Sequence, residues 1–260
     1  MESESRKAEG KPERTGMTEQ EKQFLLLQIN DALFPIGGYS HSYGLETYIQ
    51  KELVSDEESA AEYIRNNLRF SVCFNELLLA RLAYEAAAQD SENALHELLV
   101  LEELAAASRS TEEVRRAGDK MGSRFIKTAG MLPVPMDKKI FARYAKAEGS
   151  KTHAAAYGVF CAAAGIDEDR MLEHYLYSLT SAMVTNCVKT IPLSQTAGQK
   201  LLFACREIWP AVTEQVKQLK LEDYGACTPG FEVRCMQHEG LSSRLFMSSG
   251  FYVFGWYNAA

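Results

Sequence analysis

The chain has 260 residues, of which 46% are hydrophobic, and this length predicts one large domain or two small ones with a substantial core. Such a composition excludes disorder over the whole length. With 28 Lys and Arg against 35 Asp and Glu, the net charge is −7, and no stretch is rich in Lys or Arg. A protein that binds nucleic acid usually carries a basic face, so nucleic acid is not an expected partner.

The sequence also bears on the cellular compartment. No uncharged apolar run approaches the roughly 18 residues that a membrane-spanning helix needs. The opening sequence, MESESRKAEGKPERTG, has no apolar stretch that could act as a signal peptide, so we expect a cytoplasmic protein with no membrane partner. In that reducing compartment the cysteines should be thiols, and no C-x-x-C pair occurs among them. They are Cys73, Cys161, Cys187, Cys205, Cys227 and Cys235.

Two segments at the N-terminal end differ sharply in composition. Residues 1–22 carry five basic and six acidic side chains and almost no apolar ones. This predicts a disordered tail, because too little apolar surface is available to offset the entropy lost on ordering. Residues 24–38 then read FLLLQINDALFPIGG, which predicts a short apolar helix stopped by Pro35 and the Gly37-Gly38 pair.

Helix signals repeat through most of the remaining length. Ser55-x-x-Glu58 and Ser110-x-x-Glu113 have the form of capping boxes, in which a hydroxyl and a carboxylate satisfy backbone N–H groups at the start of a helix. Residues 169–189 give the clearest helix, with an apolar stripe of helical period that predicts a place in the core.

These signals together define the fold class and the domain limits. Alternating runs of Val, Ile and Thr are nearly absent, so strands are not expected. We predict an all-α fold, with roughly ten helices in one bundle-like domain over residues 23–248. Residues 249–260 are predicted to form an aromatic C-terminal extension, since from Phe246 onward the chain has no charge and six aromatic residues. Such a segment packs on its own domain, on a partner or on a second copy, or it is a peculiarity of this chain without a role.

Two groups of residues suggest chemistry. In residues 37–44, GGYSHSYG, Gly38-x-Ser40, followed by His41, begins the G-x-S-x-G pattern of a nucleophile elbow. The last glycine of that pattern is replaced by Ser42, and a helix precedes it instead of a strand. The simpler interpretation is a tight turn in which a serine caps the next helix. Cys235 and His238 share one helix face and could supply two ligands to a metal, yet two ligands do not complete a site. A small helical hydrolase or metal-dependent enzyme using these four residues is the alternative function.

The sequence favours a protein that acts through its surfaces. The phosphate-binding patterns G-x-x-x-x-G-K-[ST] and G-x-G-x-x-G are missing. We therefore expect no catalytic set, no metal site and no tightly bound cofactor in this chain, which is not predicted to be an enzyme.

Four motifs are spread across almost the whole predicted domain, and the first and third are long. They are residues 24–50 (FLLLQINDALFPIGGYSHSYGLETYIQ), 152–153 with 157–158, 186–199 (NCVKTIPLSQTAGQ), and 237–239 with 243–248 (SRLFMS). In sequence and in order, these motifs resemble one known family, the urease accessory protein UreF. The resemblance ends at Ser248, so it assigns no role to the aromatic extension.

The resemblance implies a chaperone-like scaffold. UreF proteins are all-α homodimers that join a partner called UreH or UreD, and together they recruit the GTPase UreG. The assembly docks on apo-urease and couples GTP hydrolysis to nickel insertion. On this reading nickel is handled by the complex and GTP is bound by the partner. Whether this subunit binds nickel directly, or nickel only passes through the complex, stays open.

The resemblance also implies roles for individual residues. Tyr39 and Arg244 resemble the family residues that help order the C-terminal segment for the UreH/UreD partner, and Arg suits this because its planar fork can hold several carbonyls or a carboxylate. Lys189 resembles a lysine implicated in communication with the GTPase, although a cation at that position also complements the end of a helix. The full set expected in partner binding or complex assembly is Tyr39, Ser40, His41, Lys189, Arg244 and Phe246.

Overall fold

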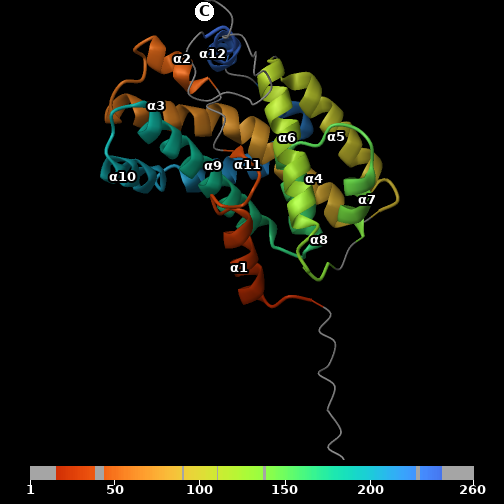
Figure 1. Ribbon diagram of the computed structural model, residues 1–260. Coiled ribbons are helices and arrows are strands. Elements are labelled where there is room, and N and C mark those ends of the chain that lie inside the picture. Colours follow the sequence, from red (N-terminus) through yellow and green to blue (C-terminus); the bar gives the residue numbers. More distant parts are fainter. Residues whose placement is uncertain are drawn as a thin grey trace, which may run out of the picture.

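The first helix begins earlier than predicted. The computed structural model describes residues 16–38, 44–89, 91–109, 111–136, 139–226 and 229–241. Helix α1 (Glu19–Ile29) starts inside the segment 1–22 that was expected to be disordered, because Thr18 and Glu21 form a capping box. The Thr18 hydroxyl accepts from the Glu21 N–H at 3.2 Å, and the Glu21 carboxylate accepts from the Thr18 N–H at 2.7 Å. Figure 1 shows α1 projecting from the bundle.

A long helical segment follows the short helix α2. Helix α2 spans Leu45–Gln50, and α3 (Glu57–Asn67), the π-helix η2 (Leu68–Leu77) and α4 (Leu78–Gln89) then follow one another without a break. The box that starts α3 is formed by Asp56 and Ser59, one residue later than the predicted Ser55 and Glu58. Aspartate takes the capping position because its carboxylate accepts the Ser59 N–H at 2.9 Å.

Helix α8 lies at the centre of the packing. The elements of this part are α5 (Ala94–Ser108), α6 (Glu112–Ala129), α7 (Ile140–Lys146) and α8 (His153–Ala163). Every residue of α8 from Ala154 to Ala163 is buried, and it packs mainly against α4 and α6. Small residues allow this close approach, since a Cβ on Gly158 would lie 3.0 Å from the backbone carbon of Ala80 and closer still to its carbonyl oxygen.

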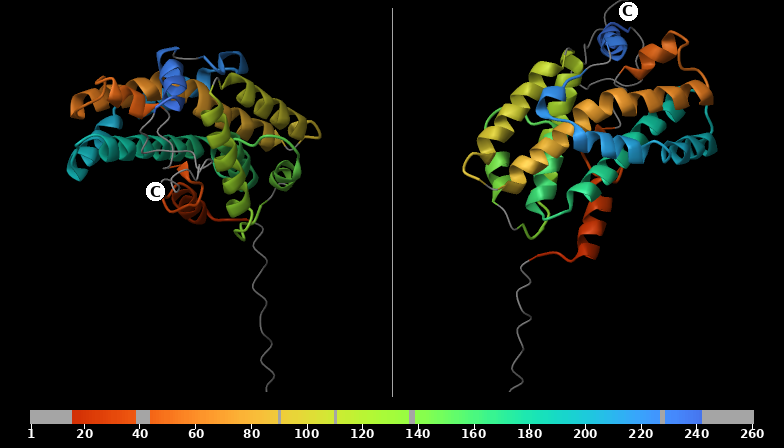
Figure 2. Two further views of the ribbon diagram at one scale, coloured as in Figure 1. Left: turned by 45° about the horizontal axis from the view of Figure 1, so that its top comes forward. Right: turned by 180° about the vertical axis from the view of Figure 1, so that it is seen from behind.

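The predicted core helix over residues 169–189 is confirmed as α9. The C-terminal elements are α9 (Glu168–Thr190), α10 (Gln195–Cys205), α11 (Trp209–Gln218), the 3₁₀ turn η3 (Leu221–Asp223) and α12 (Pro229–Glu239). On the predicted stripe of α9, Leu172, Leu176 and Cys187 are buried. In Figure 2, α12 lies across the outside of the bundle beside α2, against which it packs.

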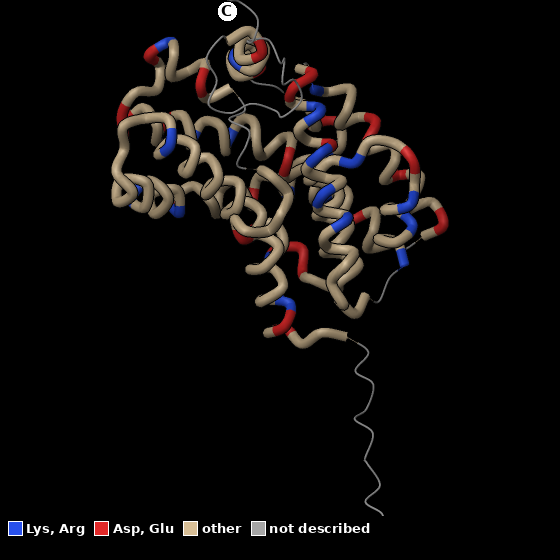
Figure 3. Tube along the Cα trace, viewed as in Figure 1, with Lys and Arg blue, Asp and Glu red and all other residues tan. Residues whose placement is uncertain are grey.

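The all-α, single-domain prediction is confirmed, and the part of the chain that the structure describes contains no strand. Within that part, no helix is long and apolar enough to cross a membrane. The five cysteines in described positions are free thiols, as predicted. In the view of Figure 3, acidic and basic residues are interspersed along the trace, and the basic ones are most frequent on α6.

Candidate functional site

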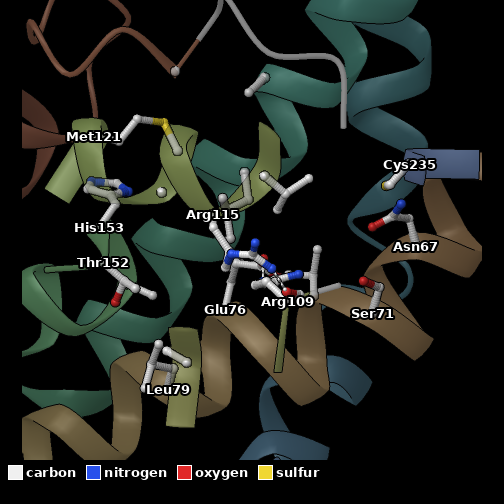
Figure 4. A pocket seen from close by; sticks show the side chains of 18 of the residues that line it. Asn67, Ser71, Glu76, Leu79, Arg109, Arg115, Met121, Thr152, His153 and Cys235 are labelled. Atoms are coloured by element: carbon white, nitrogen blue, oxygen red, sulfur yellow. Dashed lines mark hydrogen bonds and ion pairs between the residues drawn. The ribbon is translucent and has the colours of Figure 1, made fainter. Parts of the chain in front are cut away.

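A cavity of about 510 Å³ opens between α12 and the bundle. Helices α2, α3, α4, α5, α6, α8, α9 and α12 contribute to its wall, together with η2. The break in helical pitch at η2 brings Ser71 and Glu76 to the cavity beside Asn67 and Leu79 (Figure 4). The volume lies within the range of ligand pockets, and the wall combines apolar and charged side chains.

An ion pair crosses the floor of this cavity. The Arg109 guanidinium donates to the Glu76 carboxylate, and Arg115 Nη1 donates to the Arg109 carbonyl at 2.7 Å (Figure 4). Burial alone would lower the pKa of Arg109, but the charge of Glu76 opposes this and the net shift is upward. The guanidinium of Arg109 therefore stays charged, and its contact with Glu76 ties η2 to the end of α5.

His153 forms another part of the wall and is held neutral. Its Nδ1 lies 3.3 Å from the Tyr175 hydroxyl, and its Nε2 is buried without a hydrogen-bond partner among the described residues. Burial lowers the pKa of His153 to about 4, so the ring carries no proton charge near neutral pH. Among the described residues, no group of three or more His, Cys, Asp or Glu side chains is arranged to hold a metal ion. His153 is thus a partly buried structural residue next to the cavity.

Cys235 and His238 lie on one face of α12, as their spacing predicts, but they do not point to a shared ligand. Burial raises the pKa of the Cys235 thiol to about 12, so it is neither a nucleophile nor a ready metal ligand at neutral pH. His238 Nε2 lies 2.8 Å from Glu46 Oε2, and its Nδ1 lies 3.1 Å from Glu113 Oε2. Both ring nitrogens therefore face carboxylates, which does not favour the hydrolase or metal-enzyme alternative.

Several residues of the His238 cluster and the cavity floor were missed by sequence reasoning. Glu113 belongs to the capping box that was predicted with Ser110, but its carboxylate contacts His238. Ser110 lies outside the described residues. The N–H of Glu113 instead donates to the Glu239 carboxylate at 2.9 Å, so α12 caps α6. Glu46 and Arg109 gave no local signal, because their partners are distant in sequence.

The predicted partner-binding residues fall in two groups. Tyr39, Ser40, His41, Arg244 and Phe246 lie outside the described residues. Lys189 is exposed in the last turn of α9, one turn beyond Asn186, which lines the cavity.

The backbone at the end of the glycine loop meets the helix that leads toward Arg244. A Cβ on Gly44 would lie 3.1 Å from the Cys235 backbone nitrogen, and Gly44 has the left-handed φ of 86° that favours glycine. The Thr47 hydroxyl also donates to the Arg234 carbonyl at 2.9 Å. The start of α2 and the helix α12 are therefore adjacent, although almost two hundred residues separate them.

Comparison with known proteins decides the family. The family model described as UreF matches residues 54–206. A urease accessory protein UreF from Bacillus sp. (strain TB-90) is 34% identical over 224 residues, which is 86% of this chain and 97% of that relative. The chain belongs to the UreF family. The match to the UreF model runs from α3 to α10, so it includes η2, α6, α8 and α9 around the cavity, whereas α2 and α12 lie outside it.

Proposed function

We propose that this chain is a non-catalytic, chaperone-like scaffold in urease maturation. With a UreH/UreD-like protein it recruits a UreG-like GTPase and promotes GTP-dependent insertion of nickel into apo-urease. Nickel is handled by the assembled complex, GTP is bound by the partner, and the chain works in the cytoplasm as a homodimer.

Membership of the UreF family carries this proposal. The related Bacillus protein is named a urease accessory protein, and the similarity covers 97% of its length. The state of Cys235 and His238 adds support, because a thiol with a pKa of about 12 and an imidazole facing two carboxylates suit a structural role.

The arrangement around α12 supports a joint role for Tyr39 and Arg244. Gly44, which ends the glycine loop, lies against Cys235 of α12, and Arg244 follows α12 after a few residues. The described end of the loop is thus adjacent to the helix that precedes the C-terminal segment. This proximity fits a surface on which Tyr39, Ser40, His41, Arg244 and Phe246 together bind the UreH/UreD-like partner.

Two other exposed features suit contacts within the assembly. Lys189 presents its ammonium group at the end of α9, where a cation also complements the helix dipole, and we assign it to communication with the GTPase. On and after α1, Phe24, Leu27 and Leu33 are 62%, 52% and 90% exposed. Exposed apolar side chains of this kind are typical of an association surface, here assigned to the homodimer.

The first test measures urease activity in cells that express a urease operon. The gene for this chain is deleted and then restored at fixed nickel supply, and activity should disappear and return with it. Urease activity that does not depend on the chain would contradict the proposed function.

A second test addresses the partner surface. Arg244→Ala should reduce co-purification of the UreH/UreD-like partner and leave the helical circular dichroism spectrum unchanged, since the site follows the last described helix. Arg206→Ala is the matched control, because Arg206 is exposed at the end of α10 and stacks on Phe203. Equal recovery of partner with both variants would refute the role of Arg244.

A further inference from the structure

Helix α12 buries few of its side chains. Of its 11 residues, two are buried, Cys235 and His238. A helix of this length is marginal in water by itself, since nucleation is costly and few backbone bonds follow. Its stability therefore depends on contacts with other elements, and His238 contacts both α2 and α6.

The His238 ring joins three helices. Its Nε2 lies 2.8 Å from a carboxylate oxygen of Glu46 in α2, and its Nδ1 lies 3.1 Å from a carboxylate oxygen of Glu113 in α6. All three side chains are largely removed from water, with exposed fractions of 4% for His238, 11% for Glu46 and 14% for Glu113. The adjacent Glu239 carboxylate accepts the Glu113 N–H, which adds a second link from α12 to α6.

When both carboxylates are ionised, only the protonated ring can satisfy this geometry. A neutral imidazole has a single N–H, so it donates to one carboxylate and turns a lone pair toward the other. The imidazolium donates from both nitrogens, and each hydrogen bond is then charge-assisted. Docking of α12 in the observed position is therefore coupled to binding of one proton.

Among the described residues, the other charged groups near the ring do not replace this proton. From α2 and α6 the charged groups that face His238 are Glu46 and Glu113. On α12 itself, the guanidinium of Arg234 lies over the Tyr48 ring, 5.9 Å from its centroid. One turn before His238, the buried Cys235 thiol has a pKa raised to about 12, so it does not titrate near neutral pH.

We propose that His238, held between Glu46 and Glu113, is a proton-dependent latch that docks α12 on α2 and α6 and releases it as the pH rises. Arg244 follows α12 closely in the sequence, so the latch also controls where the C-terminal segment leaves the body. A pH-dependent recruitment of the UreH/UreD-like partner follows from this, and that consequence alone rests on the proposed function.

The direction of the titration agrees with the geometry. Burial lowers the pKa of His238, but the hydrogen bonds to Glu113 and Glu46 and the charges of these two residues outweigh it, and the net shift of the pKa is upward. A raised pKa in the docked state means that docking is strongest below the ordinary histidine pKa of about 6.5 and is lost as the pH rises through the docked value. Between the two pKa values, the docking equilibrium constant falls by up to about tenfold per pH unit.

Hydrogen exchange of the isolated full-length chain tests the latch. Amide protection is measured by mass spectrometry for residues 229–241 between pH 6 and 9, with correction for the pH dependence of intrinsic exchange. We expect the amide protection of α12 to fall as the pH rises, by at most about tenfold per pH unit, while α8 keeps its protection. Unchanged protection of α12 over this range would overturn the proposal.

Two variants and one control make the test specific. Glu113→Gln keeps an acceptor for the ring but removes a charge, so the loss of α12 protection should move to lower pH. His238→Gln cannot bind the proton, so its α12 should exchange without the wild-type dependence on pH. His96→Gln is the matched control, because His96 is exposed on α5, and it should behave as wild type.

A wild-type pH dependence that persists in His238→Gln, or a midpoint that Glu113→Gln does not move, would refute the latch. Because these measurements need no partner, they are independent of the urease test. A chain without any effect on urease would refute the proposed function and leave the latch standing.

Discussion

The buried carboxylate of Glu102 gives the sharpest stability prediction. Glu102 lies in α5 and is 2% exposed. Both of its oxygens accept the N–H of Thr152, the residue that caps α8, at 3.0 and 2.9 Å, and the Tyr144 hydroxyl donates to the same carboxylate. Despite these bonds, burial raises the pKa of Glu102 from 4.5 to about 7.

The raised pKa sets the sign and size of the effect. The protonated form of Glu102 is favoured by folding, so its contribution to stability is complete below pH 4.5 and is lost as the pH rises through about 7. Between pH 5.5 and pH 8, this contribution is lost mainly over the roughly 1.5 pH units that separate pH 5.5 from the folded pKa. The free energy of unfolding falls by about 2 kcal/mol as a result. In Glu102→Gln the side chain is neutral and of the same shape, so this loss should disappear.

Urea unfolding followed by circular dichroism measures the difference. Relative to wild type, Glu102→Gln should gain about 2 kcal/mol in the free energy of unfolding between pH 5.5 and pH 8. Other titrating groups are common to both proteins, so comparison with wild type isolates this site. Glu103→Gln, an exposed neighbour on α5, is the control and should follow wild type at both pH values. If Glu102→Gln also follows wild type, the predicted link between the raised pKa of Glu102 and stability is refuted.

Two further predictions concern α8. Gly158→Ala should cost about 1–3 kcal/mol of stability, because the new methyl group meets the backbone of α4 at Ala80, whereas Gly118→Ala has open space and should stabilise α6 by up to about 1 kcal/mol. Thermal unfolding compares the two, and an equally stable Gly158→Ala would contradict the tight contact. The folded pKa of His153, about 4, makes the stability of wild type fall as the pH drops below about 6.5. His153→Phe should abolish this loss of stability at acid pH. Between pH 7 and pH 5, wild type should lose about 2 kcal/mol more than this variant, and parallel losses would refute the role of His153.

The sequence by itself determined the class of fold and much of the helix pattern. The stripe over residues 169–189 predicted α9, and the near absence of alternating patterns predicted a fold without strands, because helical periodicity is a local property of the chain. Cap positions were less certain. Thr18 caps α1 within a segment whose composition predicted disorder, and Asp56 caps α3 in place of the predicted Ser55. Several polar residues near the start of a helix compete for the same N–H groups.

Only the tertiary structure decided what surrounds each polar side chain. Cys235 and His238 were readable as a pair on one helix face, but Glu46 and Glu113 complete the environment of His238 from positions 192 and 125 residues away. Likewise, nothing near Glu102 in sequence indicates that Tyr144 and Thr152 will enclose its carboxylate. Charge, burial and pKa depend on contacts that form when distant helices pack, and those contacts leave no periodic trace in one sequence.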